Sequence, residues 1–205
     1  MNLFAETSFF IILLPSLVLF HTLRGRWRFW VIILSGMVFY AWFAHWWILL
    51  FFSELLISRF YRTGSKWCLL GVAQALMVLF LFKYGAFVEN TCRSLLGLPP
   101  GHLAPMLMIL PLAISFFTFE FIHFAADNYN GKIVERDFLK YGAFIFFFPT
   151  LVSGPIKRYQ DFIPKVEIAT LSAESIRRVI TLMLIGYFKK FVIADSLVRI
   201  TRLLS

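Results

Sequence analysis

Long apolar stretches, separated by short charged or turn-rich stretches, make up most of this 205-residue chain. A helix needs about 20 apolar residues to cross the hydrocarbon core of a bilayer, so apolar runs near this length predict membrane-spanning helices. The run at 29–58 is too long for one upright helix, and we interpret it as a tight helical hairpin that turns within AWFAHWW. The pattern predicts spans near 7–23, 29–44, 46–58, 67–88 and 106–126.

The stretch FFPTLVSGPIKRYQDF, at 147–162, interrupts this pattern. Pro149 lacks a backbone donor, and Pro155 favours an extended backbone at Gly154. Lipid cannot satisfy the carbonyl groups that such breaks expose. We therefore expect the segment 141–156 to pack within protein or to line a wet cavity, and not to cross as a lipid-facing helix.

An amphipathic helix is predicted from residue 172. Ser172 is a suitable N-cap, and Glu174 falls in the first turn, where a carboxylate favours the helix. Apolar residues then recur at the i, i+3, i+4 and i+7 spacing of one helix face. Its uncharged core is too short to cross a bilayer.

Composition sets the class of the fold. Hydrophobic residues make up 60% of the chain, charged residues 15%, and the mean hydropathy is +0.79. Soluble domains carry about 25% charged residues, and a soluble fold of this size could not bury so much apolar surface. The sequence predicts one all-α domain over 1–205, a polytopic transmembrane helical bundle with re-entrant or broken helices.

The basic residues predict the orientation. The net charge is +9, and the positive side chains lie between apolar runs rather than on a solvated face, which argues against nucleic-acid binding. By the positive-inside rule we expect a multi-pass protein of the inner or plasma membrane, with its N-terminus outside. Among the basic residues up to position 140, only Lys83 and Arg93 fall on the outer side of this topology. The residues on the inner side are Arg24, Arg26, Arg28, Arg59, Arg62, Lys66, Lys132, Arg136 and Lys140.

Three ionisable residues share one face of the predicted span at 106–126. Glu120, His123 and Asp127 are spaced so that all three point to the same side of a helix. Ionisable groups inside a membrane are costly and commonly functional, so they could orient a base or hold a polar substrate. They could equally bond to one another or to a further helix. The two cysteines, Cys68 and Cys92, match no metal-ligand spacing, and we expect no bound metal or cofactor.

The basic end of the broken segment is a second candidate. Arg158 and Tyr159 follow the interruption, and an arginine beside freed backbone amides suits contact with an anion or an acyl carrier. The alternative is an anchor at the cytoplasmic headgroups.

Three stretches together resemble the membrane-bound O-acyltransferase family, in order and in spacing. They are LPLAISFFTFEFIHFAADNYNGK at 110–132, FFPTLVSGPIKRYQDF at 147–162 and GYFKKFVIADSL at 186–197. The similarity is strongest to the bacterial branch that includes alginate O-acetylases and the teichoic-acid D-alanylation proteins. The resemblance implies a helical bundle around a tunnel whose walls include half-helices. The tunnel-lining candidates are Glu120, His123, Asp127, Gly154, Pro155, Arg158 and Tyr159.

The resemblance also implies a function. Members of the family move an acyl group, here expected to be acetyl, from acyl-CoA or an acyl carrier to hydroxyls of an exported polysaccharide or cell-envelope polymer. Their catalytic histidine lies in a Trp-His context in the C-terminal half, and no histidine of this chain has that context. We therefore assign no catalytic residue and expect an N-terminal half, from a fragment, a truncated gene or a split enzyme, that is inactive alone.

The expected partners are the lipid bilayer and a C-terminal half or other envelope-polymer modification proteins, but not nucleic acid. Two other classes of function stay open. A small transporter or channel component would explain the broken helices and the ionisable residues Glu120, His123 and Asp127 on one helix face. A non-catalytic membrane interaction subunit would explain the missing histidine.

Overall fold

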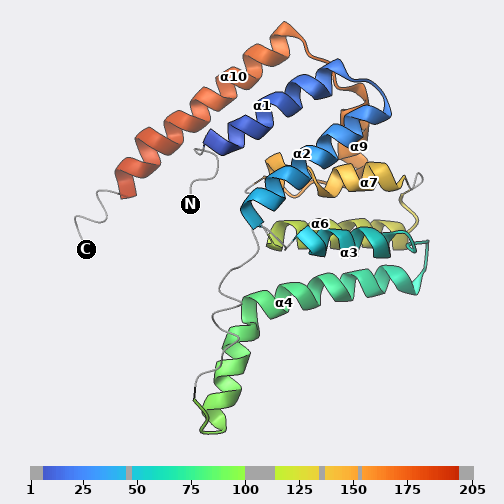
Figure 1. Cartoon of the computed structure of the whole chain (residues 1–205), viewed down its shortest axis with the longest axis vertical. Helices are drawn as coiled ribbons and strands as arrows, with labels where there is room; N and C mark the ends of the chain where they lie inside the picture. Colours follow the sequence, from blue (N-terminus) through green and yellow to red (C-terminus); the bar gives the residue numbers. More distant parts are fainter. Residues whose placement is uncertain (1–6, 45–47, 100–113, 134–136, 152–153, 199–205) are drawn as a thin grey trace. The chain divides into compact units, whose positions relative to one another are not determined.

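Every regular element that the structure, a computed structural model, describes is helical (Figure 1), which agrees with the all-α class that composition predicts. The contacts divide the chain into two compact units, Met1–Ile168 and Ala169–Ser205, and each is described by itself. The described residues are 7–44, 48–99, 114–133, 137–151 and 154–198.

The first unit contains most of the helices. Their N-termini follow capping rules where the caps are described: Ser65 accepts a hydrogen bond from the backbone N–H of Trp67, and Asp137 accepts one from that of Leu139. The helices are α1 (Thr7–Thr22), α2 (Arg26–Ala44), α3 (Ile48–Ser58), α4 (Lys66–Leu95), α6 (Ile114–Tyr129), α7 (Phe138–Ile145), α8 (Phe148–Leu151) and α9 (Tyr159–Ile168).

Two helices extend beyond their predicted ends. Helix α4 continues past residue 88 to Leu95, and α6 continues past residue 126 to Tyr129. The hairpin turn predicted at 45–47 and the start of the predicted span at 106–126 lie outside the described residues.

The core of the first unit consists largely of aromatic rings. Helix α4 packs against α6 and α3, α1 runs along α2, and α7 packs against α2 (Figure 1). Phe51 of α3 is fully buried, and its ring lies 4.4 Å from that of Tyr40, 4.6 Å from Phe117 and 5.3 Å from Phe146, centroid to centroid. Such rings bury large apolar areas and add edge and stacking interactions. The cluster joins α2, α3, α6 and the end of α7.

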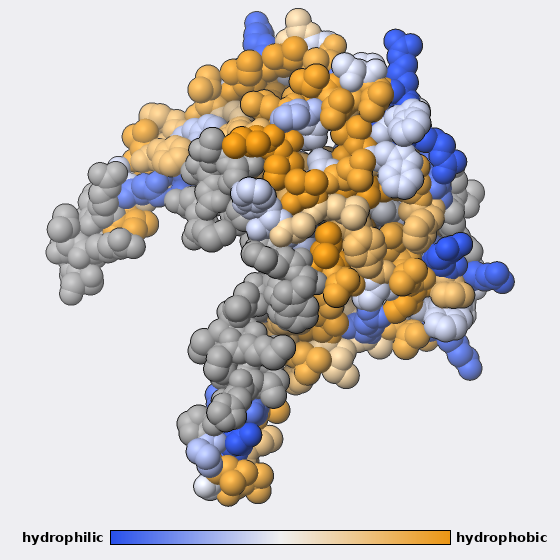
Figure 2. Space-filling view, viewed as in Figure 1, coloured by the Kyte–Doolittle hydropathy of each residue, from blue (hydrophilic) through white to orange (hydrophobic). Residues whose placement is uncertain are grey.

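The outer surface of the first unit is also strongly apolar (Figure 2). Within the described residues, α4 is the one helix long and apolar enough to cross a membrane by length and composition, and much of its surface is exposed. Its exposed apolar side chains include Leu69, Leu70, Met77, Phe80 and Phe87. An exposed apolar helix of this length is typical of a chain whose solvent is lipid.

The segment predicted to be broken contains two short helices. Helix α7 ends at Ile145, and α8 begins at Phe148, so Pro149 falls in the first turn of α8, where its missing N–H has no intrahelical partner to lose. The carbonyl of Phe146, between the two helices, lies directly against Gly36 of α2. A Cβ at that position would stand 1.8 Å from the carbonyl oxygen. Glycine therefore permits the close approach of α2 to the break.

The second unit contains α10 (Ala173–Tyr187), which begins where Ser172 accepts a hydrogen bond from the backbone N–H of Ser175. A π-helical segment, η3 (Phe188–Ala194), follows directly.

Candidate functional site

A buried ion pair joins α6 to the segment that follows the break. The Nζ of Lys157 contacts the Oε2 of Glu120, and the two side chains are 9% and 2% exposed. The ammonium group also lies 4.6 Å from the ring centroid of Phe144 and 5.8 Å from that of Phe162. Two aromatic faces and one carboxylate therefore surround this ammonium group. Burial lowers the pKa of Lys157, and the Glu120 carboxylate opposes that shift.

The ion pair fixes the course of the chain after α8. Residues 154–158 are not part of a helix, and Lys157 is their one ion-paired side chain among the described residues. Because Glu120 lies 37 residues away on α6, the pair attaches an irregular segment to a rigid helix. It can hold the broken segment in one position against α6.

The three ionisable residues predicted to share one face of α6 contact different partners. Glu120 is buried and contacts Lys157, whereas Asp127 forms an ion pair, at 3.7 Å, with Lys132 in the loop that follows the same helix. His123 is half-buried, and no hydrogen bond or ion pair joins it to either carboxylate in the described part of the chain. The structure therefore does not bring the three residues together as one cluster.

The other predicted site residues lie around the break. The backbone N–H of Gly154 donates to the carbonyl of Thr150 at 3.0 Å, and Pro155 is exposed. Arg158 is also exposed, whereas Tyr159 is buried with its ring 5.0 Å from that of Phe124. Of the two adjacent cations, it is Lys157 and not Arg158 that enters the interior.

A second buried carboxylate lies between α3 and α4. Glu54 is 3% exposed, and its Oε2 accepts a hydrogen bond from the hydroxyl of Tyr61 at 3.4 Å. Burial, and then the Glu54 carboxylate, raise the pKa of Tyr61, so its hydroxyl stays protonated and donates. Gly71 of α4 makes room for this hydroxyl, since a Cβ there would lie 1.6 Å from it.

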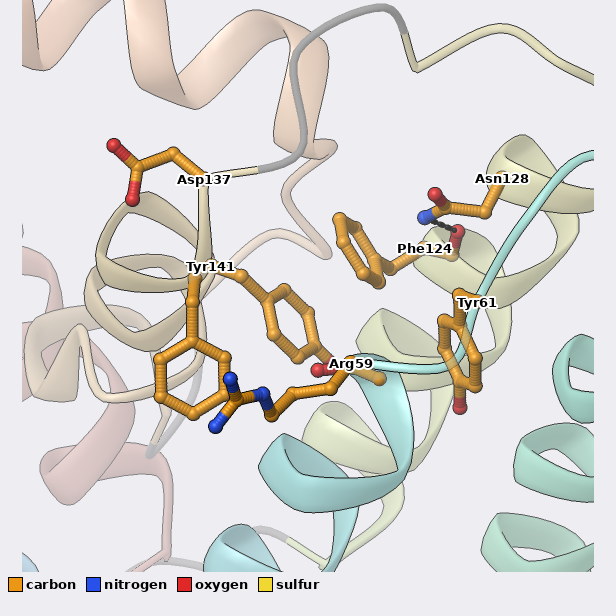
Figure 3. Close-up of a pocket in the computed structure, with 8 residues that line it drawn as sticks. Arg59, Tyr61, Phe124, Asn128, Asp137 and Tyr141 are labelled. Carbon is orange, nitrogen blue, oxygen red and sulfur yellow. Dashed lines mark hydrogen bonds between the residues drawn. The ribbon is translucent and has the colours of Figure 1, made fainter.

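A pocket of about 230 Å³ opens where α3, α6 and α7 meet (Figure 3). Its lining includes two side chains that are at least 98% buried, Asn128 and Tyr141. Both carry a polar atom with no hydrogen-bond partner in the described ranges, the Oδ1 of Asn128 and the hydroxyl of Tyr141. The full lining is Ser58, Arg59, Tyr61, Phe124, Asn128, Asp137, Phe138 and Tyr141.

Sequence reasoning did not single out this pocket or the role of Lys157. The i, i+3, i+4 spacing marks Asn128 as a neighbour of Phe124, but nothing local shows that its amide oxygen is left without a partner. Across the described residues, no group of three His, Cys, Asp or Glu side chains is placed to hold a metal ion.

The similarity of the chain to curated proteins agrees with the three ordered motifs of its sequence and shows the class of protein. The chain belongs to the membrane-bound O-acyltransferase family. No protein-family model and no solved structure matches it.

Three curated relatives are similar to the chain. It is 30% identical to the "Probable alginate O-acetylase AlgI" of Pseudomonas aeruginosa, over 95% of this chain and 40% of that protein. It is 30% identical to the peptidoglycan O-acetyltransferase of Helicobacter pylori, over 63% of this chain and 29% of that protein. It is 29% identical to the teichoic acid D-alanyltransferase of Bacillus subtilis, over 80% of this chain and 40% of that protein. The chain thus spans about two fifths or less of the length of these relatives.

Proposed function

We propose that the protein serves in acyl transfer, with acetyl as the acyl group, to hydroxyls of an exported polysaccharide or another cell-envelope polymer. The observation that carries this proposal is the similarity, over 95% of the chain, to proteins named as alginate O-acetylases. Relatives named for peptidoglycan and teichoic acid support the broader class of envelope polymers as acceptors.

In the proposed reaction a general base removes the proton of the acceptor hydroxyl. The hydroxyl oxygen then attacks the carbonyl carbon of an acyl group held as a thioester on coenzyme A or an acyl carrier. An ester bond forms, the carbon–sulfur bond breaks, and the thiol leaves with a proton. The residues of this chain are proposed to wall the tunnel, with the Glu120–Lys157 pair holding the segment after the break in position.

We also propose that the base comes from outside these 205 residues, in a C-terminal half or a partner protein. His123 lacks a carboxylate partner among the described residues that would orient it as a base. His21 packs edge-on against the ring of Phe20, 5.2 Å away, and does not have the family's Trp-His context. His45 and His102 lie outside the described residues and also lack that context.

Disrupting the gene in its source organism is expected to remove most of the alkali-labile acetyl groups from one envelope polymer, and restoring the gene should return them. The measurement is acetate released by mild base from the purified polymer. The His123→Ala variant should restore acetylation to within about twofold of wild type, because losing a positioned general base would cost roughly 10²–10⁴-fold. An unchanged amount of released acetate after disruption would argue against the function. If the His123→Ala variant did not restore acetylation although the protein was present at its normal level, His123 would be identified as the base.

The proposed location is a multi-pass position in the inner or plasma membrane, with the N-terminus outside. Contacts between the three basic loops support it. Arg26 pairs with Asp137 at 3.4 Å, and the Arg59 guanidinium lies 5.5 Å from the ring centroid of Phe138. The N–H of Gly64 donates to the carbonyl of Tyr129, the last residue of α6, at 2.9 Å. Residues 26, 59 and 137–138, one part of each of the three basic loops, therefore lie in contact within the first unit.

This topology predicts the labelling of single cysteines in intact cells. Arg26→Cys and Arg62→Cys, each in a Cys92→Ser background, should react with a membrane-impermeant maleimide only after the membrane is opened. The exposed Cys92 of the otherwise unchanged protein lies on the predicted outer side and should react in intact cells, while the buried Cys68 should stay unreactive. Labelling of positions 26 and 62 from opposite sides would contradict the hairpin.

A further inference from the structure

One continuous helix makes up most of the second unit. Helix α10 passes into η3 at Phe188, which has the ordinary helical dihedral angles φ −57° and ψ −49°, and helical backbone continues to residue 198 (Figure 1). Of the described residues of α10 and η3, none is buried. The surface of this helix is therefore available to a partner outside the unit.

Apolar side chains form one row along α10. Ile176, Ile180 and Met183 follow the spacing of one helix face, and they are 42%, 52% and 40% exposed. By the same spacing, Arg178 lies opposite this row and Arg177 at its border. An exposed apolar face with cations beside and behind it is typical of a helix that lies in a membrane interface.

The π-helical segment keeps this row apolar. Lys190 comes seven residues after Met183, so a regular α-helix would place its ammonium group in the row. A π turn takes one residue more than an α turn, so the row passes on to Phe191. The ring of Phe191 stacks on that of Tyr187 at 5.7 Å, and Lys190 instead contacts Asp195. Such turns are rare, and this one preserves an apolar face that no described part of the chain buries.

Basic residues at both ends of an apolar stretch indicate the orientation. Arg177 and Arg178 precede residues 179–188, and Lys189 and Lys190 follow them. These ten residues rise about 15 Å, half of the roughly 30 Å of a hydrocarbon core. An upright helix would hold one of the two basic pairs near the bilayer centre, where charged side chains are costly. A helix parallel to the membrane keeps both pairs at the headgroups.

The charge of the helix favours one kind of lipid. The described residues of the second unit include four basic and two acidic side chains, which leaves a net charge of +2. One of the acidic side chains, Asp195, already pairs with Lys190. Basic residues of an interfacial helix are attracted to anionic lipids, and arginine binds phosphate oxygens with several donors at once.

We propose that α10 and η3 lie in the plane of the membrane and bind the surface of a bilayer that contains anionic phospholipids. The apolar row enters the boundary between headgroups and acyl chains, and Arg177 and Arg178 contact lipid phosphates. The exposed Leu182 and Ile185 on the other side keep the helix within the headgroup layer rather than above it. This binding does not depend on the proposed acyl transfer.

The test is spin labelling of the full chain in vesicles of phosphatidylcholine and phosphatidylglycerol, with single cysteines in a Cys92→Ser background and Cys68 buried. The labelled positions are Ile176, Ile180 and Met183 in the row, and Glu174 and Thr181 on the opposite side. Labels in the row should collide with oxygen at nearly equal depths, about 5–10 Å below the headgroup boundary. Labels on the opposite side should collide with a water-soluble nickel chelate.

Three results of this experiment would overturn the proposal. A depth that increases along the row by about 1.5 Å per residue would show a membrane-spanning helix. Row labels that neither reagent reaches would show that protein covers the face. Row labels that only the chelate reaches would show that the helix lies in water.

Arg177→Gln combined with Arg178→Gln tests the anionic partner. The readout is the ratio of membrane-docked to water-exposed label at position 180. Each cation near an anionic surface contributes about fivefold, so the ratio should fall about 25-fold with phosphatidylglycerol and less than about twofold in phosphatidylcholine alone. Arg177→Lys combined with Arg178→Lys keeps both charges and should leave the ratio nearly unchanged. An unchanged ratio in the glutamine variant, or an equal fall in both variants, would overturn the anionic partner.

Discussion

Replacing Lys157 with methionine is expected to lower the free energy of unfolding by about 3–5 kcal/mol, because the change leaves the Glu120 carboxylate buried without its cation. Methionine keeps much of the volume of the lysine stem, so the effect reports the lost charge rather than a cavity. The loss can be measured as a shift in the midpoint of denaturant-induced unfolding in detergent micelles, followed by tryptophan fluorescence.

Two further variants separate the ion pair from general damage to the segment. Arg158→Met alters the adjacent exposed cation and should change the unfolding free energy by no more than about 0.5 kcal/mol. Glu120→Gln combined with Lys157→Met removes both charges and should recover a large part of the loss. The comparison also needs Glu120→Gln and Lys157→Met measured separately. If the loss of unfolding free energy in the double variant equalled the sum of those two losses, the ion pair would not be the cause.

Replacing Gly36 with alanine is expected to destabilise the first unit by about 1–3 kcal/mol, although alanine favours a helix over glycine by about 1 kcal/mol. The new methyl group would stand 1.8 Å from the carbonyl oxygen of Phe146, which is backbone and cannot rotate away as a side chain could. Helix α2 and the break between α7 and α8 must therefore separate. The measurement is the melting temperature of the purified protein.

Gly186→Ala is the control for this substitution. Gly186 lies within α10, and a Cβ there meets nothing within 4 Å. The change should therefore leave stability unchanged or raise it by up to about 1 kcal/mol through helix propensity. If Gly36→Ala raised the melting temperature as well, the close approach of α2 to the break would not exist in solution.

Local rules were sufficient for features that depend on neighbouring residues. The all-α class follows from composition, and the N-cap at Ser172 follows from the polar residue that precedes an amphipathic pattern. The break near Pro149 follows from proline chemistry, which acts within one turn of helix.

Features that depend on contacts across the chain could not be predicted in this way. Lys157 and Arg158 are equivalent cations in the sequence, and only the position of Glu120 on another helix decides which of them is buried. In the same way, Gly36 looks like an ordinary residue of an apolar helix until Phe146 is placed against it. The grouping of Glu120, His123 and Asp127 was an inference from helix spacing, and it could not anticipate that two of them pair with different lysines.

The hydrogen bonds of Arg28 have a consequence for how the chain assembles. This residue at the start of α2 donates to the carbonyl groups of Val166 and Glu167 at 3.5 and 3.3 Å, across 138 and 139 positions of sequence. During synthesis at about 5–20 residues per second, the partner carbonyls follow Arg28 by roughly 7–28 s. Over that interval Arg28 lacks these two hydrogen-bond acceptors, so completion of the first unit is a late event that depends on the synthesis of α9.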